Sequence, residues 1–298
     1  MPTCDVVIPN DVFAAARDTI GAFFEPISRI DRDTAARDFL DVSKSLKRAE
    51  ILERYATLRG SKVLEIGSGF GTNVAAWILE FGIDGYGVEP SSQGFDGGYA
   101  ASRRLLAANG VDPERITSAV GEHLPFPDQS FDIVYSANVL EHTNEPERVL
   151  AEAVRVLRPG GTLHMEIPNH LSYFEGHYLL LQPPLVNRRI LPAWVSLLGR
   201  DSTFSKTLQT QINPIWCRRV LRKIDATHPL EIVSFGEDIF LERLSRPFQF
   251  EAEGVSSRLR TLIRGLQFVN RWNWIGALIV AARGYYPMYV TVRRRPSR

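Results

Sequence analysis

Two acidic residues stand near the ends of short apolar runs, where a parallel sheet would present them to a ligand. Glu65 lies within the run Lys62–Ile66, two residues before Gly67, and Glu89 follows the run Asp84–Val88. Glu89 is 22 residues beyond Gly67, and an acid about 20 residues after a glycine turn accepts hydrogen bonds from both hydroxyls of a ribose. A carboxylate at position 65 attracts a cationic group and repels a pyrophosphate. We therefore expect a nucleoside ligand that carries positive charge and no phosphate.

A glycine-rich turn connects the first of these acids to the next helix. Residues 67–72 read Gly-Ser-Gly-Phe-Gly-Thr, and glycines let a ligand press against the backbone at the carboxyl end of a strand. The dinucleotide fingerprint G-x-G-x-x-G needs a third glycine where this chain has Thr72. A nicotinamide-dependent oxidoreductase therefore remains as an alternative that both Thr72 and Glu65 disfavour.

The same turn resembles a known motif. Glu65, Gly67 and Gly69 match the pattern E-x-G-x-G, the first motif of the class I S-adenosylmethionine-dependent methyltransferases. The resemblance implies S-adenosylmethionine as the cofactor, with its methionine part packed against the glycines. It also implies that Glu65 engages the amino end of the cofactor and that Glu89 binds the ribose.

Two later segments resemble further motifs of this family. Residues 119–132 resemble the adenine-side loop D-A-E-x-L-P-F-x-D-x-S-F-D, with Val120 and Gly121 in place of the aspartate and alanine. Residues 137–142 resemble the S/N-x-L-E-H segment that follows the fourth strand. The resemblance covers about residues 44–168. It implies nine cofactor-binding residues: Glu65, Gly67, Ser68, Gly69, Glu89, Pro90, Gly121, Glu122 and Asn138.

Three of the six histidines follow predicted strand ends, where an acceptor should bind. His142 follows the fourth strand, and His170 and His177 follow the fifth. A histidine with a pKa near neutrality is a suitable base for a hydroxyl group, so we predict these three as catalytic residues. Each also has a structural interpretation, since a histidine can simply orient a loop or line a pocket. His170, Glu175 and His177 are also groups that bind metal ions, but their spacing matches no standard motif, so we expect no metal.

The order of the predicted elements is that of an α/β fold. Apolar runs predict strands at 62–66, 84–88, 133–136, 162–167, 230–236 and 288–293, and helical spacing predicts helices at 14–24, 34–55 and 146–157. We expect a Rossmann-like, doubly wound seven-stranded sheet with a helical N-terminal cap and an insertion after the fifth strand. The expected parts are 1–60 (cap), 61–168 (S-adenosylmethionine-binding core), 169–230 (insertion or lid for substrate recognition) and 231–298 (completion of the sheet, with an amphipathic helical segment).

The composition of the chain excludes few classes of protein. The 298 residues are 44% hydrophobic and 23% charged, as in ordinary globular proteins, and the net charge of +1 gives no reason to expect nucleic-acid binding. Two unpatterned cysteines and a start without the signal-peptide pattern lead us to expect a cytoplasmic protein. Residues 259–292 combine aromatic and basic side chains. We expect a helix packed on the core there, with peripheral membrane contact as the alternative.

The histidines and the insertion suggest the chemistry. We expect methyl transfer to an oxygen atom of a small-molecule or saccharide acceptor: a sugar, glycan-precursor or lipid-like hydroxyl. The region after the fourth strand lacks an N-P-P-Y-type clamp for an amide or adenine, and aromatic residues of the insertion suit sugar rings or an apolar channel. A non-catalytic scaffold that keeps the cofactor site is the remaining alternative.

Overall fold

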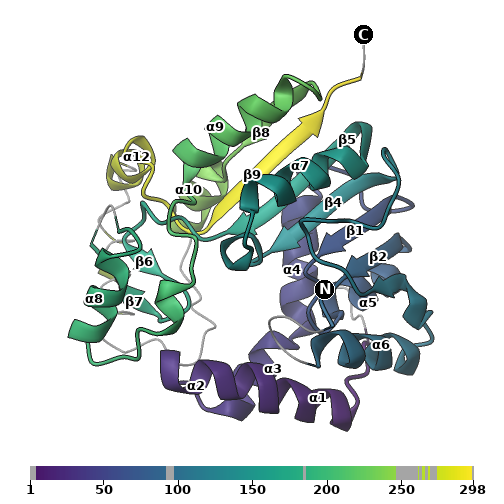
Figure 1. Cartoon of the computed structure of the whole chain (residues 1–298), viewed down its shortest axis with the longest axis horizontal. Helices are drawn as coiled ribbons and strands as arrows, with labels where there is room; N and C mark the ends of the chain where they lie inside the picture. The colour runs from purple at the N-terminus through teal and green to yellow at the C-terminus, as the bar shows by residue number, and fades with distance from the viewer. Residues whose placement is uncertain are drawn as a thin grey trace.

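A seven-stranded sheet forms the centre of the protein (Figure 1). The computed structural model describes residues 5–91, 97–183, 186–245, 261, 264, 265, 268 and 274–296. The strand order is β3-β2-β1-β4-β5-β9-β8, and only β9 runs antiparallel to its neighbours. The strands are β1 (Lys62–Ile66), β2 (Asp84–Val88), β3 (Ile116–Thr117), β4 (Phe131–Ala137), β5 (Leu157–Ile167), β8 (Leu230–Ser234) and β9 (Met288–Arg294).

This order confirms the predicted doubly wound sheet. The chain moves outward from β1 through β2 to β3 and then returns to β4 on the other side of β1. In such sheets the ligand binds outside the carboxyl ends of the strands at this switch point. The carboxyl ends of β1, β2 and β4 are therefore where the site should lie.

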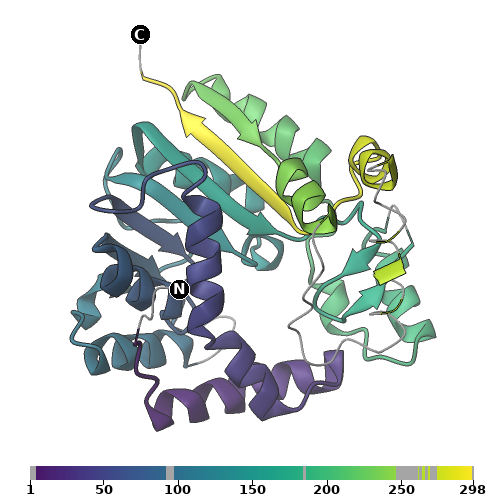
Figure 2. The same ribbon diagram turned by 180° about the vertical axis from the view of Figure 1, so that it is seen from behind.

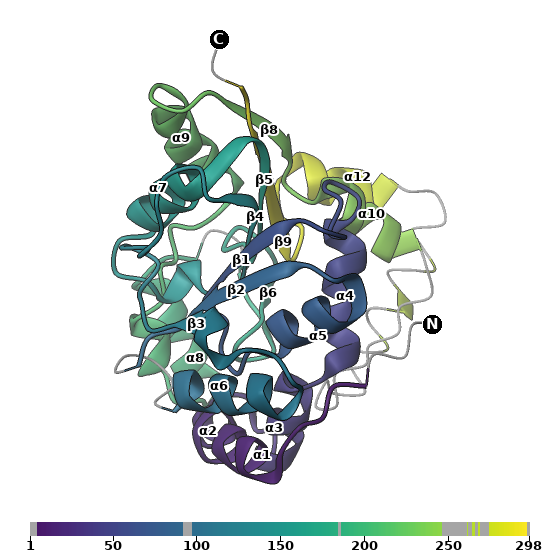
Figure 3. The same ribbon diagram turned by 90° about the vertical axis from the view of Figure 1, so that its right-hand side faces the viewer.

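Helices cover both faces of the sheet (Figure 3). α7 and α9 pack on one face, where their buried apolar residues join those of β4, β5 and β9. α4 and α5 pack on the other face, where Trp77 lies against Tyr135 and Leu52 is fully buried. The helices of this core are α4 (Val42–Leu52), α5 (Thr72–Phe81), α6 (Gly98–Ala108), α7 (Pro146–Val156), α9 (Pro214–Asp225) and α10 (Glu237–Ser245).

The N-terminal helices form an arm along one side of the molecule. Figure 2 shows that α4 continues from this arm along the face of the sheet that is hidden in Figure 1. The predicted helix 34–55 is two helices, because Asp41 accepts a hydrogen bond from the Ser43 N–H and begins a new helix. Apolar spacing continues across this break and conceals it. The arm contains α1 (Asn10–Ala16), the π-turn η1 (Arg17–Gly21), α2 (Ala22–Ser28) and α3 (Arg32–Phe39), which lead into α4.

The insertion after β5 has a small apolar core of its own. Tyr178, Leu191 and Leu208 are fully buried there together with Ile27 of α2, so the insertion also rests on the N-terminal arm. By contrast, α9 packs on the main core. The compact part of the insertion therefore ends before α9 rather than at residue 230. It contains β6 (Phe174–Glu175), β7 (Leu180–Leu181), α8 (Ile190–Leu197) and η4 (Phe204–Lys206).

Two of the predicted elements differ from those in the structure. β5 begins at Leu157 rather than at the predicted residue 162, and it includes Pro159–Gly161. Its pairing with β4 is irregular at this point. Much of the 259–292 segment lies outside the described residues. Its described helix, α12 (Trp274–Ala281), consists only of apolar residues and glycine and is therefore not amphipathic. Among the described residues, no helix is both long and apolar enough to span a bilayer.

Candidate functional site

The glycine turn, residues 67–71, joins the ends of β1 and β2. The N–H groups of Gly67 and Ser68 both donate to the Val88 carbonyl, at 2.9 and 3.0 Å. The Gly69 N–H donates to the Glu89 carboxylate at 2.8 Å. Gly67 has φ of +70°, and a Cβ at this position would lie 2.3 Å from a methyl carbon of Val139. Only glycine fits here, because both the backbone conformation and the packing exclude a side chain.

Glu65 and Glu89, which we call the cofactor acids, are both buried at this turn. Asn73 donates its amide to one oxygen of Glu65 at 2.6 Å. Burial raises the pKa of Glu65 to about 8, although the Asn73 bond and the Arg48 charge oppose the shift. Burial likewise raises the pKa of Glu89 to about 7, opposed by the Gly69 N–H. A ligand that donates hydrogen bonds or carries positive charge would therefore stabilise the ionised form of both carboxylates.

Unpaired buried atoms indicate where such a ligand fits. The second carboxylate oxygen of Glu65 and the hydroxyl of Ser68 have no hydrogen-bond partner within the part of the chain that is described. A buried polar atom without a partner costs free energy, and a donor group on a ligand would remove that cost. A cationic amino group beside Glu65 and ribose hydroxyls beside Glu89 meet this requirement.

The other predicted cofactor residues lie along the same edge of the sheet, and their contacts to a cofactor stay predictions. Gly121 is buried, and a Cβ there would lie 3.1 Å from Ile66 and Val149. Glu122 accepts hydrogen bonds from the N–H groups of Asn144 and Glu145, so it anchors the loop before α7. Asn138 has φ of +54° and donates its N–H to the Glu166 carbonyl. Pro90 directly follows Glu89 and is half-buried.

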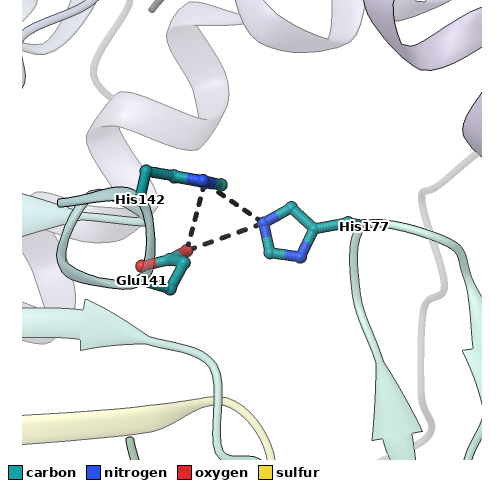
Figure 4. Close-up of side chains that lie close together, drawn as sticks. All are labelled: Glu141, His142 and His177. Atoms are coloured by element: carbon teal, nitrogen blue, oxygen red, sulfur yellow. Dashed lines mark hydrogen bonds and ion pairs between the residues drawn. The ribbon is translucent and has the colours of Figure 1, made fainter. Parts of the chain in front are cut away.

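A second group of ionisable residues lies just beyond β4 (Figure 4). Glu141 and His142 lie on the short helix η3 (Leu140–His142), and His177 comes from the insertion after β6. The two histidine Nε2 atoms are 3.3 Å apart, and one Glu141 oxygen is 3.7 Å from each. We call these three residues the Glu–His–His cluster. Val139, two residues before Glu141, contacts Gly67, so the cluster lies close to the glycine turn.

Burial and charge act differently on the members of the cluster. Burial raises the pKa of Glu141 to about 7, against the opposing charge of His177. Burial acts to lower the pKa of His177, but Glu175 and Glu141 overcome it and the pKa is raised. One carboxylate oxygen of Glu175 lies 2.7 Å from the Nδ1 atom of His177. Burial and the neighbouring His177 lower the pKa of His142, whose side chain keeps 31% of its surface exposed.

The structure brings together two of the three histidines predicted as catalytic. His170 is buried nearby, with its Nε2 atom unpartnered among the described residues, but it is not one of the three donors that meet. Burial lowers its pKa to about 4. Glu141 was missed from the sequence, and Glu175 was considered there only as a metal-capable group. The signal was present, because each precedes a predicted histidine, directly in Glu141-His142 and at two residues' distance from His177.

The fold and the glycine turn are those of an α/β protein that binds a nucleoside cofactor. Comparison with known proteins narrows this class. Residues 64–165 match the methyltransferase domain family. An uncharacterized methyltransferase from Mycobacterium sp. (strain JLS) is 39% identical over 118 residues, which are 40% of this chain and 43% of that protein. The chain thus spans less than half the length of this curated relative.

Two solved structures share the fold. A putative sarcosine dimethylglycine methyltransferase from Galdieria sulphuraria has a TM-score of 0.52 and 14% identity, with 96% of each chain covered. Phosphoethanolamine N-methyltransferase 2 from Haemonchus contortus, solved with S-adenosyl-L-methionine, has a TM-score of 0.50 and 19% identity, covering 94% of this chain and 60% of that one. Residues 64–165 of this chain therefore match a methyltransferase domain, and the fold is that of the class I S-adenosylmethionine-dependent methyltransferases. This finding confirms the predicted cofactor, S-adenosylmethionine, and goes against the nicotinamide alternative.

Proposed function

We propose that this protein transfers the methyl group of S-adenosylmethionine to a hydroxyl oxygen of a sugar, glycan-precursor or lipid-like acceptor. The observation that carries the proposal is the Glu–His–His cluster beside the glycine turn. Methyl transfer from a sulfonium is a direct displacement in which the protein mainly aligns the reactants. A hydroxyl oxygen must in addition lose its proton. A cluster of ionisable groups favours this loss, and its carboxylate has no hydrogen bond to any described residue.

The surroundings of the cluster support an acceptor with apolar faces. The ring of Phe204 lies 5.6 Å from that of His142 and 5.3 Å from that of His177. Tyr178 packs against the same phenylalanine. Aromatic walls of this kind stack on sugar rings or line a channel for a lipid chain.

A cavity of about 720 Å³ adjoins the same region. It is lined by residues of the insertion and of α9, among them Trp216, Arg188, Arg189 and Arg219, and by none of the glycine turn. The segment that forms part of its wall is tied to the cluster, because Gln209 donates its N–H to the Glu141 carbonyl. An aromatic ring among arginines suits an acceptor that carries an anionic group, as a glycan precursor does.

The test is a transfer assay with methyl-labelled S-adenosylmethionine and a panel of sugar, glycan-precursor and lipid hydroxyls. We expect a labelled methyl ether, whose stability to acid and base separates it from esters and whose fragmentation separates it from methylamines. His177→Gln should lower turnover, whereas His228→Gln, which changes a half-buried histidine just before β8 and outside the cluster, should not. Transfer to nitrogen would contradict the proposal. Cofactor binding with no transfer to any member of the panel would favour the scaffold alternative.

A further inference from the structure

We propose that the Glu–His–His cluster binds one divalent transition-metal ion, with Glu141, His142 and His177 as its protein ligands. The inference deepens the proposed function and rests on it for the role of the ion, which would be to bind the acceptor hydroxyl. The binding site itself rests on geometry alone.

The three donor atoms are spaced as metal ligands are. The distances are 3.3 Å between the two Nε2 atoms and 3.7 Å from the Glu141 oxygen to each of them. A triangle with these sides contains a point about 2.1 Å from every corner, and metal–nitrogen and metal–oxygen bonds to zinc are about 2.0–2.2 Å long. An ion in the plane of the three atoms is therefore within bonding distance of all of them, and a fourth ligand requires only a small approach of the donors toward one another.

Glu141 is the second observation that points to a cation. Its side chain has no exposed surface, and neither of its carboxylate oxygens has a hydrogen-bond partner within the described ranges. The histidine nitrogens are too far away, at 3.7 Å, to serve as hydrogen-bond donors. A buried carboxylate without hydrogen bonds is costly, and proteins compensate a buried charge by an ion pair or by metal coordination. The ion pair of Glu141 with His177 is long, at 3.7 Å, so a metal ion between the two groups would compensate the charge better.

His177 is oriented as a metal ligand usually is. Its Nδ1 atom lies 2.7 Å from one oxygen of Glu175, and the other oxygen accepts the Tyr178 N–H at 2.8 Å. Glu175 is itself buried. When Nδ1–H donates to this carboxylate, the lone pair of Nε2 faces the cluster. A carboxylate behind a ligating histidine fixes the tautomer and the ring orientation in many metal sites.

The donor set indicates which metals would bind. Two imidazoles and one carboxylate suit zinc, iron, cobalt and nickel, whereas magnesium prefers oxygen ligands alone. Three protein ligands leave at least one coordination position for a small oxygen ligand, as in catalytic zinc sites. The exposed 31% of the His142 side chain indicates that the cluster is accessible on that side.

The reaction balances with the ion in this role. The acceptor hydroxyl binds the metal, which lowers the pKa of that hydroxyl, and the proton leaves to solvent. The oxygen then forms a bond to the methyl carbon while the carbon–sulfur bond breaks, and the sulfur keeps the electron pair. The products are a methyl ether and S-adenosylhomocysteine. The metal neither gains nor loses electrons.

Metal binding is measured directly on the full chain. The protein is treated with a chelator, dialysed, and titrated with Zn²⁺ by equilibrium dialysis and with Co²⁺ by visible absorption. We expect one ion per chain. Glu175→Gln should weaken binding by about 10–100-fold, and Glu141→Gln and His177→Gln should weaken it further. His123→Gln is the matched control and should bind as the parent protein does.

Binding of S-adenosylhomocysteine is measured on each variant to show that it is folded. The absence of stoichiometric Zn²⁺ or Co²⁺ binding by the parent protein would overturn the inference. Binding that survives in Glu141→Gln and His177→Gln would overturn it as well. Methyl transfer to a hydroxyl that persists after complete metal removal contradicts the metal role while leaving the proposed function intact. Metal binding without transfer to any hydroxyl contradicts the proposed function while leaving the metal site intact.

Discussion

Glu89→Gln is the substitution that best tests the cofactor site, because the effect should depend on pH. Burial raises the pKa of Glu89 to about 7 in the ligand-free protein. If ribose hydroxyls donate to its carboxylate, only the ionised form offers both acceptor oxygens. The ligand and the proton therefore compete for the same group. Glutamine has nearly the same shape, carries no charge and does not titrate, so it removes this competition.

The size of the expected change in Kd follows from the pKa of Glu89 and from the strength of its hydrogen bonds. At pH 8 most of Glu89 is ionised, and replacing a charged acceptor of two hydrogen bonds should cost about 1.5–3 kcal/mol, or roughly 10–150-fold in Kd. At pH 6 only about a tenth of Glu89 is ionised, so the parent protein itself loses about 1.4 kcal/mol. The ratio of the two Kd values should therefore shrink about tenfold from pH 8 to pH 6.

Calorimetric titration with S-adenosylhomocysteine at pH 6, 7 and 8 measures this ratio. At pH 7, titrations in two buffers of different ionisation enthalpy should show that the parent protein releases about half a proton more on binding than Glu89→Gln does. Glu53→Gln, which removes an exposed acid at the end of α4, should leave every Kd unchanged. An unaltered Kd for Glu89→Gln at pH 8, or a ratio that does not vary with pH, would refute the ribose assignment.

Three further outcomes test the packing and electrostatics of the site. Because the pKa values of both cofactor acids are raised on folding, their stability contribution is complete below about pH 4.5 and is lost as the pH rises through 7 and 8. In urea unfolding, the stability difference between the ligand-free parent protein and a Glu65→Gln/Glu89→Gln variant should therefore change by about 6 kcal/mol from pH 5 to pH 8.5, and a constant difference would contradict it. Gly67→Ala should lower stability by about 1–3 kcal/mol and weaken cofactor binding, and Val139→Ala in the same chain should restore the part caused by steric overlap; no recovery in thermal unfolding would count against the contact. Tyr178→Phe removes the oxygen that accepts the buried Ser205 N–H at 3.0 Å, which should cost about 1–3 kcal/mol in denaturant unfolding, whereas Tyr173→Phe should cost less than half as much; equal losses would exclude this reason.

The predictions that the structure confirms concern short segments of chain. The strand Lys62–Ile66 has the predicted bounds, and Glu65 and Glu89 lie where strand, turn and spacing place them. The reason is that a strand–turn–helix unit depends on residues close together in sequence. The break between α3 and α4 also depends on a local signal, since Asp41 is a favoured N-cap residue. The apolar spacing nevertheless predicted one continuous helix across it.

The Glu–His–His cluster required the tertiary structure. His142 and His177 lie 35 residues apart and belong to different parts of the fold, so no spacing rule pairs them. The same is true of Arg48, which sequence reasoning missed: this residue of α4 lies 3.4 Å from Glu166 of β5 and opposes the raised pKa of Glu65. Such pairs form only after helices pack on the sheet.

The sequence by itself determined the class of fold, the identity of the cofactor and the place of the two cofactor acids, because repeated strand–turn–helix units specify a parallel sheet and its ligand edge. Tertiary structure alone decided which polar residues meet beyond β4. It buried Glu141, placed His177 beside it and left His170 apart. The physical reason is that the insertion has its own apolar core and rests on α2. Its position beyond the carboxyl end of β5, and thus the position of His177, follows from packing between segments distant in the chain (Figure 1).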